Sequence, residues 1–254
     1  MISNNKNTFW AIVLIAVFLT SCSQTGSEAI SSKEMSDQAT KDTYVNINRR
    51  IYRFNAGLDH YLVKPVARSY QSVTPPFLNT SISNFFLNLG DIGNTFNNIL
   101  QAKPLDAVND AERFIFNSTF GLAGLLDVAS AAGLEKHDED FGQTLAAWGV
   151  GSGPYIMLPF LGPSTLRDAT AKLSVDQLTN LANYSEKSIP FFLVEKLDLR
   201  AGLFSKEAAF KDISDDSYSA IRDAWLQRRD YLIRDGKVDE DTEMDLIDEL
   251  ESLE

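Results

Sequence analysis

The chain has one cysteine, Cys22, among 254 residues, and two histidines, His60 and His137. A single cysteine excludes a disulfide within the chain. Basic residues are also in deficit, with 23 Lys and Arg against 35 Asp and Glu and a formal net charge of −12. Because no basic patch is visible that could neutralise phosphates, a nucleic acid is not an expected partner.

The sequence near the N-terminus is apolar, but only over a short run, Phe9–Leu19. A helix needs about 20 apolar residues to span a bilayer, so this run is too short for a transmembrane helix. Lys6 precedes it and two small residues follow it, an arrangement typical of a secretory signal peptide. We therefore expect residues 1–21 to be a signal peptide that is removed.

Cys22 follows the apolar run in the sequence Leu-Thr-Ser-Cys, which resembles the lipobox of bacterial lipoproteins. In a lipobox the cysteine receives a diacylglyceryl group and becomes the new N-terminus. The alternative is an incidental cysteine. Several acyl chains on Cys22 would make a stable membrane anchor. Ser23, rather than Asp, favours the periplasmic leaflet of the outer membrane over the inner membrane.

Composition divides the mature chain into three parts. Residues 22–43 are small and polar and are expected to form a flexible tether. Residues 44–234 carry the helical patterns and are predicted to form a single domain. Residues 235–254 hold ten acids and one lysine, which predicts a disordered acidic tail. Docking to a partner is the alternative role of this tail.

Apolar residues recur at spacings of three and four, which predicts a mainly α fold. A first helix from Tyr44 should end or kink at Pro65. A second helix, over 78–100, should break near Gly90 and Gly93. The sequence predicts further helices from Pro104 onward and over 164–184, 191–211 and 214–234, the last capped by Ser214 and ended by Gly236.

Strand signals are scarce, and the best lies over 120–130, where glycines between apolar residues predict a hairpin or an apolar loop.

The second predicted helix has a polar face without charges, since Asp91 is the only charged residue between Arg68 and Lys103. Amides and hydroxyls lie opposite its Phe and Ile stripe, where a surface helix would carry Lys and Glu. Such a face is expected where protein encloses it or where it lines a confined watery space. Its members are Asn79, Ser81, Asn84, Asn88, Asn94, Asn97 and Asn98.

A longer segment, FGQTLAAWGVGSGPYIMLPFLGPSTL over 141–166, has no charged residue and yet contains five glycines and three prolines. One interpretation is a large ordinary core with uncharged loops. The other is a protein embedded in one bilayer leaflet, with helices in the membrane plane and broken segments lining a polar cavity. Both interpretations explain the absence of charge, and the second also explains the breaks.

Catalytic motifs are missing, and an enzyme is not expected. His60 lies in a predicted helix beside Asp59, and His137 lies among acids whose spacing matches no metal-ligand motif. A carboxylate site with His137 is the weaker alternative. Ser152 fails the G-x-S-x-G hydrolase pattern, because Val150 and Pro154 occupy the glycine positions. No nucleotide-binding signature fits, so no cofactor is predicted.

Ordered blocks from about Asn48 to Asp235 resemble the MlaA/VacJ family of outer-membrane lipoproteins. The blocks are NRRIYRFNAGLDHYLVKPVARSY, SNFFLNLGDIGNTFNNILQAK, ERFIFNSTFGLAGLLDVA, FGQTLAAWGVGSGPYIMLPFLGPSTLRD and, more weakly, SYSAIRDAWLQRRDYL. The chain departs from the family before Asn48, where KDTYVNI replaces an Asp-Pro-containing run.

The resemblance implies a ring of amphipathic helices around a polar channel, with a small Gly-rich hairpin or loop. It also implies removal of stray glycerophospholipids from the outer leaflet, with a trimeric porin and a soluble periplasmic lipid carrier as partners. The alternative is a lipoprotein that scaffolds porins without moving lipid. By analogy, the candidate channel and loop residues are Phe120, Leu122, Leu125, Leu126, Asn84, Asn88 and Asn97.

Overall fold

The computed structural model describes residues 42–174, 188–205, 207 and 216–237. All of them belong to one compact unit, Met35–Glu254. The predicted signal peptide and Cys22 lie outside the described residues, as do nearly all of the tether and the acidic tail. Their roles stay predictions.

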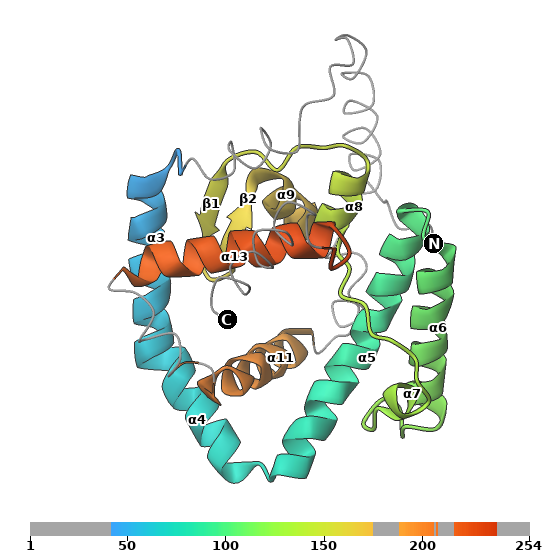
Figure 1. The fold of residues 1–254 in the computed structure, drawn as a ribbon. Helices are drawn as coiled ribbons and strands as arrows, with labels where there is room; N and C mark the ends of the chain where they lie inside the picture. The colour runs from blue at the N-terminus through green and yellow to red at the C-terminus, as the bar shows by residue number, and fades with distance from the viewer. Residues whose placement is uncertain (1–41, 175–187, 206, 208–215, 238–254) are drawn as a thin grey trace, which may run out of the picture. The chain divides into compact units, whose positions relative to one another are not determined.

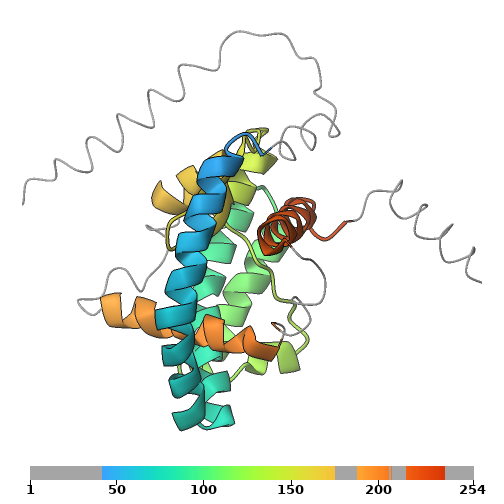
Figure 2. The ribbon, with the colours of Figure 1, turned by 90° about the vertical axis from the view of Figure 1, so that its left-hand side faces the viewer.

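The first helical region runs through three elements, α3 (Val45–Leu58), η1 (Asp59–Val63) and α4 (Lys64–Val73). Pro65 was expected to end or kink the helix, and it does not end it. It lies in the first turn of α4, where a missing N–H costs least, and the backbone adopts π-helical bonding just before it. The helical path therefore continues to Val73, and Figure 2 shows it as one long rod.

The second helix, α5 (Pro76–Leu100), is continuous, so the predicted break at Gly90 and Gly93 is wrong. Each glycine costs only about 1 kcal/mol in a helix interior. Packing of α5 against α6 (Pro104–Thr119) outweighs that cost. Pro104 begins α6, as expected.

The strands are not where the sequence indicated them. Residues 120–127 form a loop of consecutive turns, and a short helix, α7 (Val128–Ala131), follows it. The hairpin lies instead within the charge-free segment, where β1 (Tyr155–Leu158) pairs antiparallel with β2 (Gly162–Thr165). The sequence predicted a hairpin or an apolar loop over 120–130, and the structure shows the apolar loop.

The remaining helices are α8 (Phe141–Ala147), α9 (Leu166–Ser174), α11 (Ser188–Gly202) and α13 (Ser217–Ile233). Helices are thus present in each of the expected ranges 164–184, 191–211 and 214–234, and residues 175–184, 206, 208–211 and 214–215 of those ranges lie outside the described residues. Ser214 lies outside those residues, and Asp216 occupies the N-cap position of α13. Gly236 follows α13 with a φ of +76° and its N–H bonded to the Tyr231 carbonyl, which confirms the predicted stop.

Contacts between elements of this unit form a closed circuit (Figure 1). The path runs from α3 through η1 to α4, turns into α5, and returns through α8, α9 and the hairpin to α3. Helix α11 packs on both α4 and α5, α6 lines α5, and α13 contacts α8 and β2. The fold is mainly α, with the helices arranged as a ring.

Two asparagines of α3 connect it to the hairpin and so close this circuit. The Asn48 side chain donates to the Tyr155 carbonyl at 3.1 Å and accepts from the Met157 N–H at 2.9 Å. Asn55 donates to the Leu158 carbonyl at 2.9 Å and accepts from the Phe160 N–H at 2.9 Å. Each amide therefore extends the strand hydrogen bonding onto a helix.

Buried apolar side chains are few and mostly small. The core cluster comprises Tyr155, Met157 and Tyr218, with partly buried neighbours from α3 and α13. Buried polar and charged residues outnumber the buried apolar ones among the described residues. No helix of the described residues is both long and apolar enough to cross a membrane.

Candidate functional site

Helix α5 buries its polar face and exposes its apolar one. Asn88 and Asn98 are 3% and 0% exposed, whereas Phe77 and Ile99 are 69% and 60% exposed. In water this arrangement is unfavourable, because each exposed large apolar side chain forgoes roughly 1.5–3 kcal/mol of burial. The pattern of α5 is therefore inverted relative to a water-facing helix.

The buried amides of α5 are held by specific partners. Asn94 donates to the His137 carbonyl at 2.7 Å and accepts from the Glu139 N–H at 3.0 Å. Asn98 donates to Asp110 Oδ2 at 2.8 Å. The sequence predicted enclosure by protein or a watery space, and for these residues the structure shows enclosure by protein.

Asn97, a predicted channel residue, is 3% exposed and lies on the face of α5 that contacts α8. Its Nδ2 donates to the Gly93 carbonyl, and its Oδ1 accepts from Thr144 Oγ1, both at 2.9 Å. Asn97 therefore offers little surface to a ligand in this conformation. Asn84 and Asn88, the other two predicted amides, lie closer to the N-terminal end of α5, beside the 120–127 loop.

The loop over 120–127, which we call the apolar loop, has a constrained backbone. Leu122 and Ala123 have φ values of +53° and +60°, an uncommon conformation for residues with a side chain, and Gly124 follows at +88°. A Cβ at Gly124 would lie 2.5 Å from Asn88 Nδ2. The loop is thus pressed against α5 at Asn88.

Hydrogen bonds fix the apolar loop to both neighbouring helices. The N–H groups of Ala123 and Gly124 donate to carbonyls at the end of α6, at 3.1 and 2.9 Å. From α5, Asn84 Nδ2 donates to the Leu125 carbonyl at 3.3 Å. With the backbone held in this way, the loop presents four of the predicted residues outward: Phe120, Leu122, Leu125 and Leu126, which are 67%, 67%, 39% and 47% exposed.

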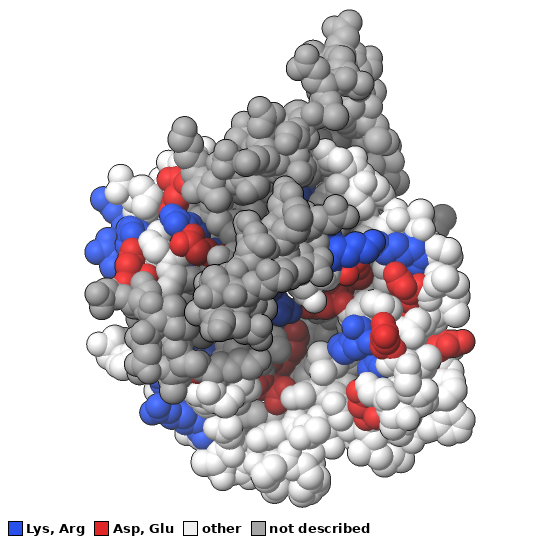
Figure 3. Space-filling view, viewed as in Figure 1, with Lys and Arg blue, Asp and Glu red and all other residues white. Residues whose placement is uncertain are grey.

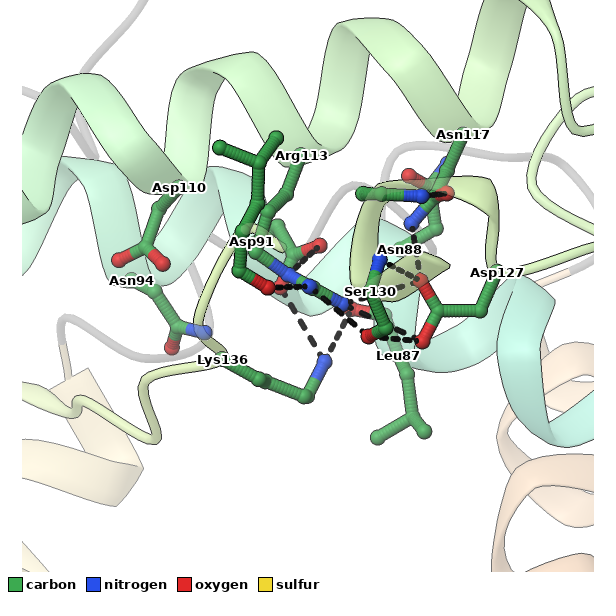
Figure 4. A network of polar contacts seen from close by, with 12 residues as sticks. Leu87, Asn88, Asp91, Asn94, Asp110, Arg113, Asn117, Asp127, Ser130 and Lys136 are labelled. Atoms are coloured by element: carbon green, nitrogen blue, oxygen red, sulfur yellow. Dashed lines mark hydrogen bonds and ion pairs between the residues drawn. The ribbon is translucent and has the colours of Figure 1, made fainter. Parts of the chain in front are cut away.

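Beneath the apolar loop lies a network of four charged side chains (Figure 4). Arg113 of α6 extends between Asp91 and Asp127, and its Nη2 lies 3.2 Å from Asp127 Oδ1. Lys136 donates to Asp91 Oδ1 at 3.2 Å. Two cations thus face two carboxylates, so the network carries no net formal charge.

Asp127 both ends the apolar loop and caps α7. Its carboxylate accepts from the Ser130 N–H at 3.1 Å and from Ser130 Oγ at 2.6 Å. Burial acts to raise its pKa, but the Ser130 hydrogen bonds and the charge of Arg113 outweigh burial and lower the pKa. Asp127 is therefore a well-compensated carboxylate.

Asp91 differs from Asp127, because it is fully buried and incompletely paired. Burial raises the pKa of the Asp91 carboxyl, and the opposing effects of Lys136 and Arg113 do not cancel that rise. Asp91 Oδ2 lies 3.7 Å from Arg113 Nε, which is too long for a hydrogen bond. A shallow recess opens at this point, lined by residues that include Leu87, Asn88, Asp91 and Lys136.

The two histidines and Ser152 show no catalytic arrangement among the described residues. His137 Nδ1 lies 2.9 Å from Asp110 Oδ1, and Asp110 is itself bonded to Asn98. His60 packs edge-on against Tyr61. In the described part of the chain, no group of three or more possible ligands could hold a metal ion. The Ser152 carbonyl accepts from the Arg167 N–H.

The charge-free segment exposes apolar side chains on a scaffold of turns. Trp148, Phe160 and Leu166 are 54%, 72% and 54% exposed. Uncharged surface also surrounds the α4–α5 turn at the bottom of Figure 3, where Val73 and Phe77 are exposed. Exposed apolar area of this extent indicates surroundings other than water.

Sequence reasoning did not predict the network that joins Arg113 and Lys136 to the loop and to Asp127 at its end. They lie on three different segments, and the fold alone joins them. The only available signal was the scarcity of charge around Asp91 and Asp127, since an isolated acid in an uncharged stretch requires a partner.

The chain is similar to known proteins over most of its length. The sequence family described as MlaA lipoprotein matches residues 40–232. The intermembrane phospholipid transport system lipoprotein MlaA of Shigella flexneri is 31% identical over 234 residues, covering 90% of this chain and 89% of that protein. The Escherichia coli (strain K12) protein of that name is 31% identical over the same shares, and the Haemophilus influenzae one is 28% identical over 93% and 94%.

A solved structure reported as "Structural basis for maintenance of bacterial outer membrane lipid asymmetry" shares the fold. Its TM-score is 0.66 at 33% sequence identity, and the match covers 74% of this chain and 97% of that one.

Proposed function

Because the chain belongs to the MlaA lipoprotein family, we propose that it removes mislocalised glycerophospholipids from the outer leaflet of the outer membrane. It passes them through a polar channel to a soluble periplasmic carrier and thereby maintains lipid asymmetry. Lipidated Cys22 anchors it in the periplasmic leaflet, and a trimeric porin is its membrane partner. The proposal assigns the chain no catalysis.

The observation that carries this proposal is the inverted burial of α5. A helix with buried amides and exposed phenylalanines is stable where its outer face meets acyl chains. Helix α6 adds Leu105, Val108 and Ile115, which are 83%, 55% and 57% exposed. Most of these amides are bonded to neighbouring protein groups, so the polar groups of α5 that are proposed to meet a head group are those beside the apolar loop, Asn84 and Asn88.

The apolar loop is the proposed contact for acyl chains. Its four exposed apolar side chains belong to the loop that ends at Asp127, which is bonded to Arg113, so apolar and polar groups adjoin within a few residues of the chain. Phospholipids need both kinds of surface at once, an apolar one for the tails and a polar one for the head group. Asn84 and Asn88 are the proposed polar contacts from α5.

The test measures phospholipid exposed on the surface of cells that lack the gene and carry a complementing variant. Wild type should restore a low level, and Cys22→Ala should fail because the anchor is lost. If deletion leaves outer-leaflet phospholipid unchanged, while the wild-type protein in complemented cells associates with a porin, the chain scaffolds porins and the transport proposal is wrong.

A matched pair of variants tests the loop itself. Phe120 and Phe160 are similarly exposed, at 67% and 72%, and each packs edge-on against one other phenylalanine. Phe120→Ser should raise surface phospholipid severalfold, whereas Phe160→Ser in the hairpin turn should have a smaller effect. Equal effects of the two variants would remove the special role of the apolar loop.

A further inference from the structure

The recess beside the apolar loop contains three buried polar atoms without a hydrogen-bond partner in the described part of the chain. They are Asn88 Oδ1, Asp91 Oδ2 and Arg113 Nε. The residues that carry these atoms are buried, with Asn88 3%, Asp91 0% and Arg113 1% exposed. Buried polar atoms in native proteins are nearly always paired, so three together in one recess indicate a polar group that binds there.

The recess is open to the surface rather than sealed. Leu87 at its edge is 46% exposed, and the Lys136 side chain is 33% exposed. Lys136 is held in place by Asp91 Oδ1 and, at 3.4 Å, by the Leu87 carbonyl. A ligand can therefore approach along Leu87, and it reaches the three buried atoms once side chains at the edge of the recess shift.

The unpaired atoms define the chemistry of this ligand. Arg113 Nε and Asp91 Oδ2 form an ion pair at 3.7 Å without a hydrogen bond between them, so the donor Nε still needs an acceptor, and the acceptors Asp91 Oδ2 and Asn88 Oδ1 still need donors. An ammonium group only donates, and it would add a third cation beside Arg113 and Lys136. A phosphate only accepts, and it would place an anion against the buried carboxylate of Asp91. A hydroxyl group both donates and accepts, and it carries no charge.

The surroundings connect this hydroxyl to a lipid. Asn88 touches the apolar loop at Gly124, and Asn84, which also lines the recess, binds the Leu125 carbonyl. The exposed side chains of Leu87, Leu125 and Leu126 offer an apolar path next to the recess. A free polyol would gain nothing from these leucines, but a phospholipid would.

We propose that the recess formed by Asn88, Asp91 and Arg113 binds a hydroxyl group of a phospholipid head group, such as the glycerol of phosphatidylglycerol. This proposal rests on the proposed function and specifies the head groups that the chain prefers. Lipids that carry a head-group hydroxyl should be favoured over lipids of equal charge that lack one.

The experiment compares phosphatidylglycerol with phosphatidylpropanol, which has the same phosphate charge and nearly the same size but no head-group hydroxyl. The full chain, purified in detergent, is titrated with mixed micelles that contain either lipid in radiolabelled form. Wild type should bind phosphatidylglycerol about tenfold more tightly, the effect of one hydrogen-bonded hydroxyl at a buried charged site. Free glycerol is added as a competitor and should not displace the lipid at millimolar concentration.

Two variants separate the hydroxyl contact from the charge of the site. Asn88→Ala removes one unpaired acceptor with a side chain too small to strike Gly124, and it should reduce the preference to about threefold or less. Lys136→Met removes a cation and the donor to Asp91 Oδ1, but it leaves Asn88 Oδ1 and Arg113 Nε in place. It should weaken binding of both anionic lipids and keep more of the preference for phosphatidylglycerol than Asn88→Ala does.

The outcomes distinguish failure of this inference from failure of the proposed function. Equal binding of both lipids by wild type overturns the hydroxyl site while leaving lipid transport intact, and the recess is then simply hydrated. Binding of neither lipid contradicts the proposed function itself. Displacement by free glycerol would identify a polyol site instead of a head-group site. If Asn88→Ala does not fold, the comparison in wild type and in Lys136→Met still decides.

Discussion

Two buried networks in the described part of the chain use the same side chains, arginine and aspartate, but are completed to different degrees. Arg229 of α13 binds Asp140 through two bonds of 2.7 Å and Asp168 through bonds of 2.8 and 3.0 Å. Arg113 of α6 makes bonds of 3.2 and 3.4 Å to Asp127 and lies 3.7 Å from Asp91.

The two networks have different roles because of this difference. The two bidentate pairs use four of the five N–H donors of Arg229, so its network holds α8, α9 and α13 together and leaves little for a ligand to bind. Only glycine fits at position 142, because a Cβ there would lie 2.4 Å from Arg229 Nη2. The Arg113 network is less complete, and it lies under the apolar loop.

The largest effect is expected from breaking the complete network. Arg229→Met leaves the buried Asp168 with Arg167 alone and the partly buried Asp140 with the Gln143 N–H, and it should lower the free energy of unfolding by about 3–5 kcal/mol. Thermal or denaturant unfolding of the full chain measures it. Arg229→Lys serves as the control, since it keeps the charge and loses the fork geometry, and it should cost less. A change below about 1 kcal/mol in Arg229→Met would contradict the structural role.

Arg113→Met should have a smaller effect, about 2–3 kcal/mol, measured in the same way. Asp91 retains Lys136, and Asp127 retains its Ser130 bonds, so neither carboxylate is left alone. If this variant costs more than Arg229→Met, the incomplete network is the main structural one and the comparison above is wrong.

The apolar loop can be tested with two glycines of similar φ. Gly124 has a φ of +88° and abuts Asn88, whereas Gly133 has a φ of +84° and nothing within 4 Å of an added Cβ. Gly133→Ala should cost about 1–2 kcal/mol from the left-handed backbone alone. Gly124→Ala should cost more, and it should also raise surface phospholipid in cells. Equal losses in the free energy of unfolding for the two variants would show that the loop can move away from Asn88 without penalty.

The smallest effect is a difference in pH dependence. Burial acts to raise the pKa of Asp140, but the Arg229 bonds outweigh it and the pKa is lowered, so its stabilising contribution is present at neutral pH and lost on acidification below about pH 4. The pKa of Asp91 is raised by burial, so its contribution has the opposite sign and decreases as the pH rises above about 4.

Asp140→Asn should therefore destabilise the protein more at pH 7 than near pH 3, whereas Asp91→Asn should be nearly neutral at pH 7. Denaturant unfolding at both pH values checks the signs. A destabilisation by Asp91→Asn as large as that by Asp140→Asn at pH 7 would show that Asp91 is as well paired as Asp140.

Much of the fold could be predicted from spacing, but one local rule failed and another left two structures open. Gly90 and Gly93 did not break α5, because the amides on its buried face bond to α6, α8 and the segment between them, and that gain exceeds the cost of two glycines. The glycines of 120–130 predicted a hairpin or an apolar loop, and the structure has the loop, because with Leu122, Ala123 and Gly124 all at positive φ the backbone turns instead of extending.

Of the candidate site, the sequence predicted the loop and its four apolar side chains but not the network beneath them. Asn84 and Asn88 were found by their uncharged face, and Asn97 on the same face is occupied by Thr144. Helical periodicity shows that these amides share a face, and it does not show which neighbour covers each turn of the helix.

The sequence by itself determined the helical class, the family and the presence of an uncharged face opposite an apolar one, because periodicity and composition are local properties. Only the tertiary structure decided which of these faces is inside, since the apolar stripe of α5 is exposed and its amides are buried. It also decided which charges meet. Arg113, Asp127 and Lys136 lie on separate segments, and a charge buried away from water finds its partner through the fold.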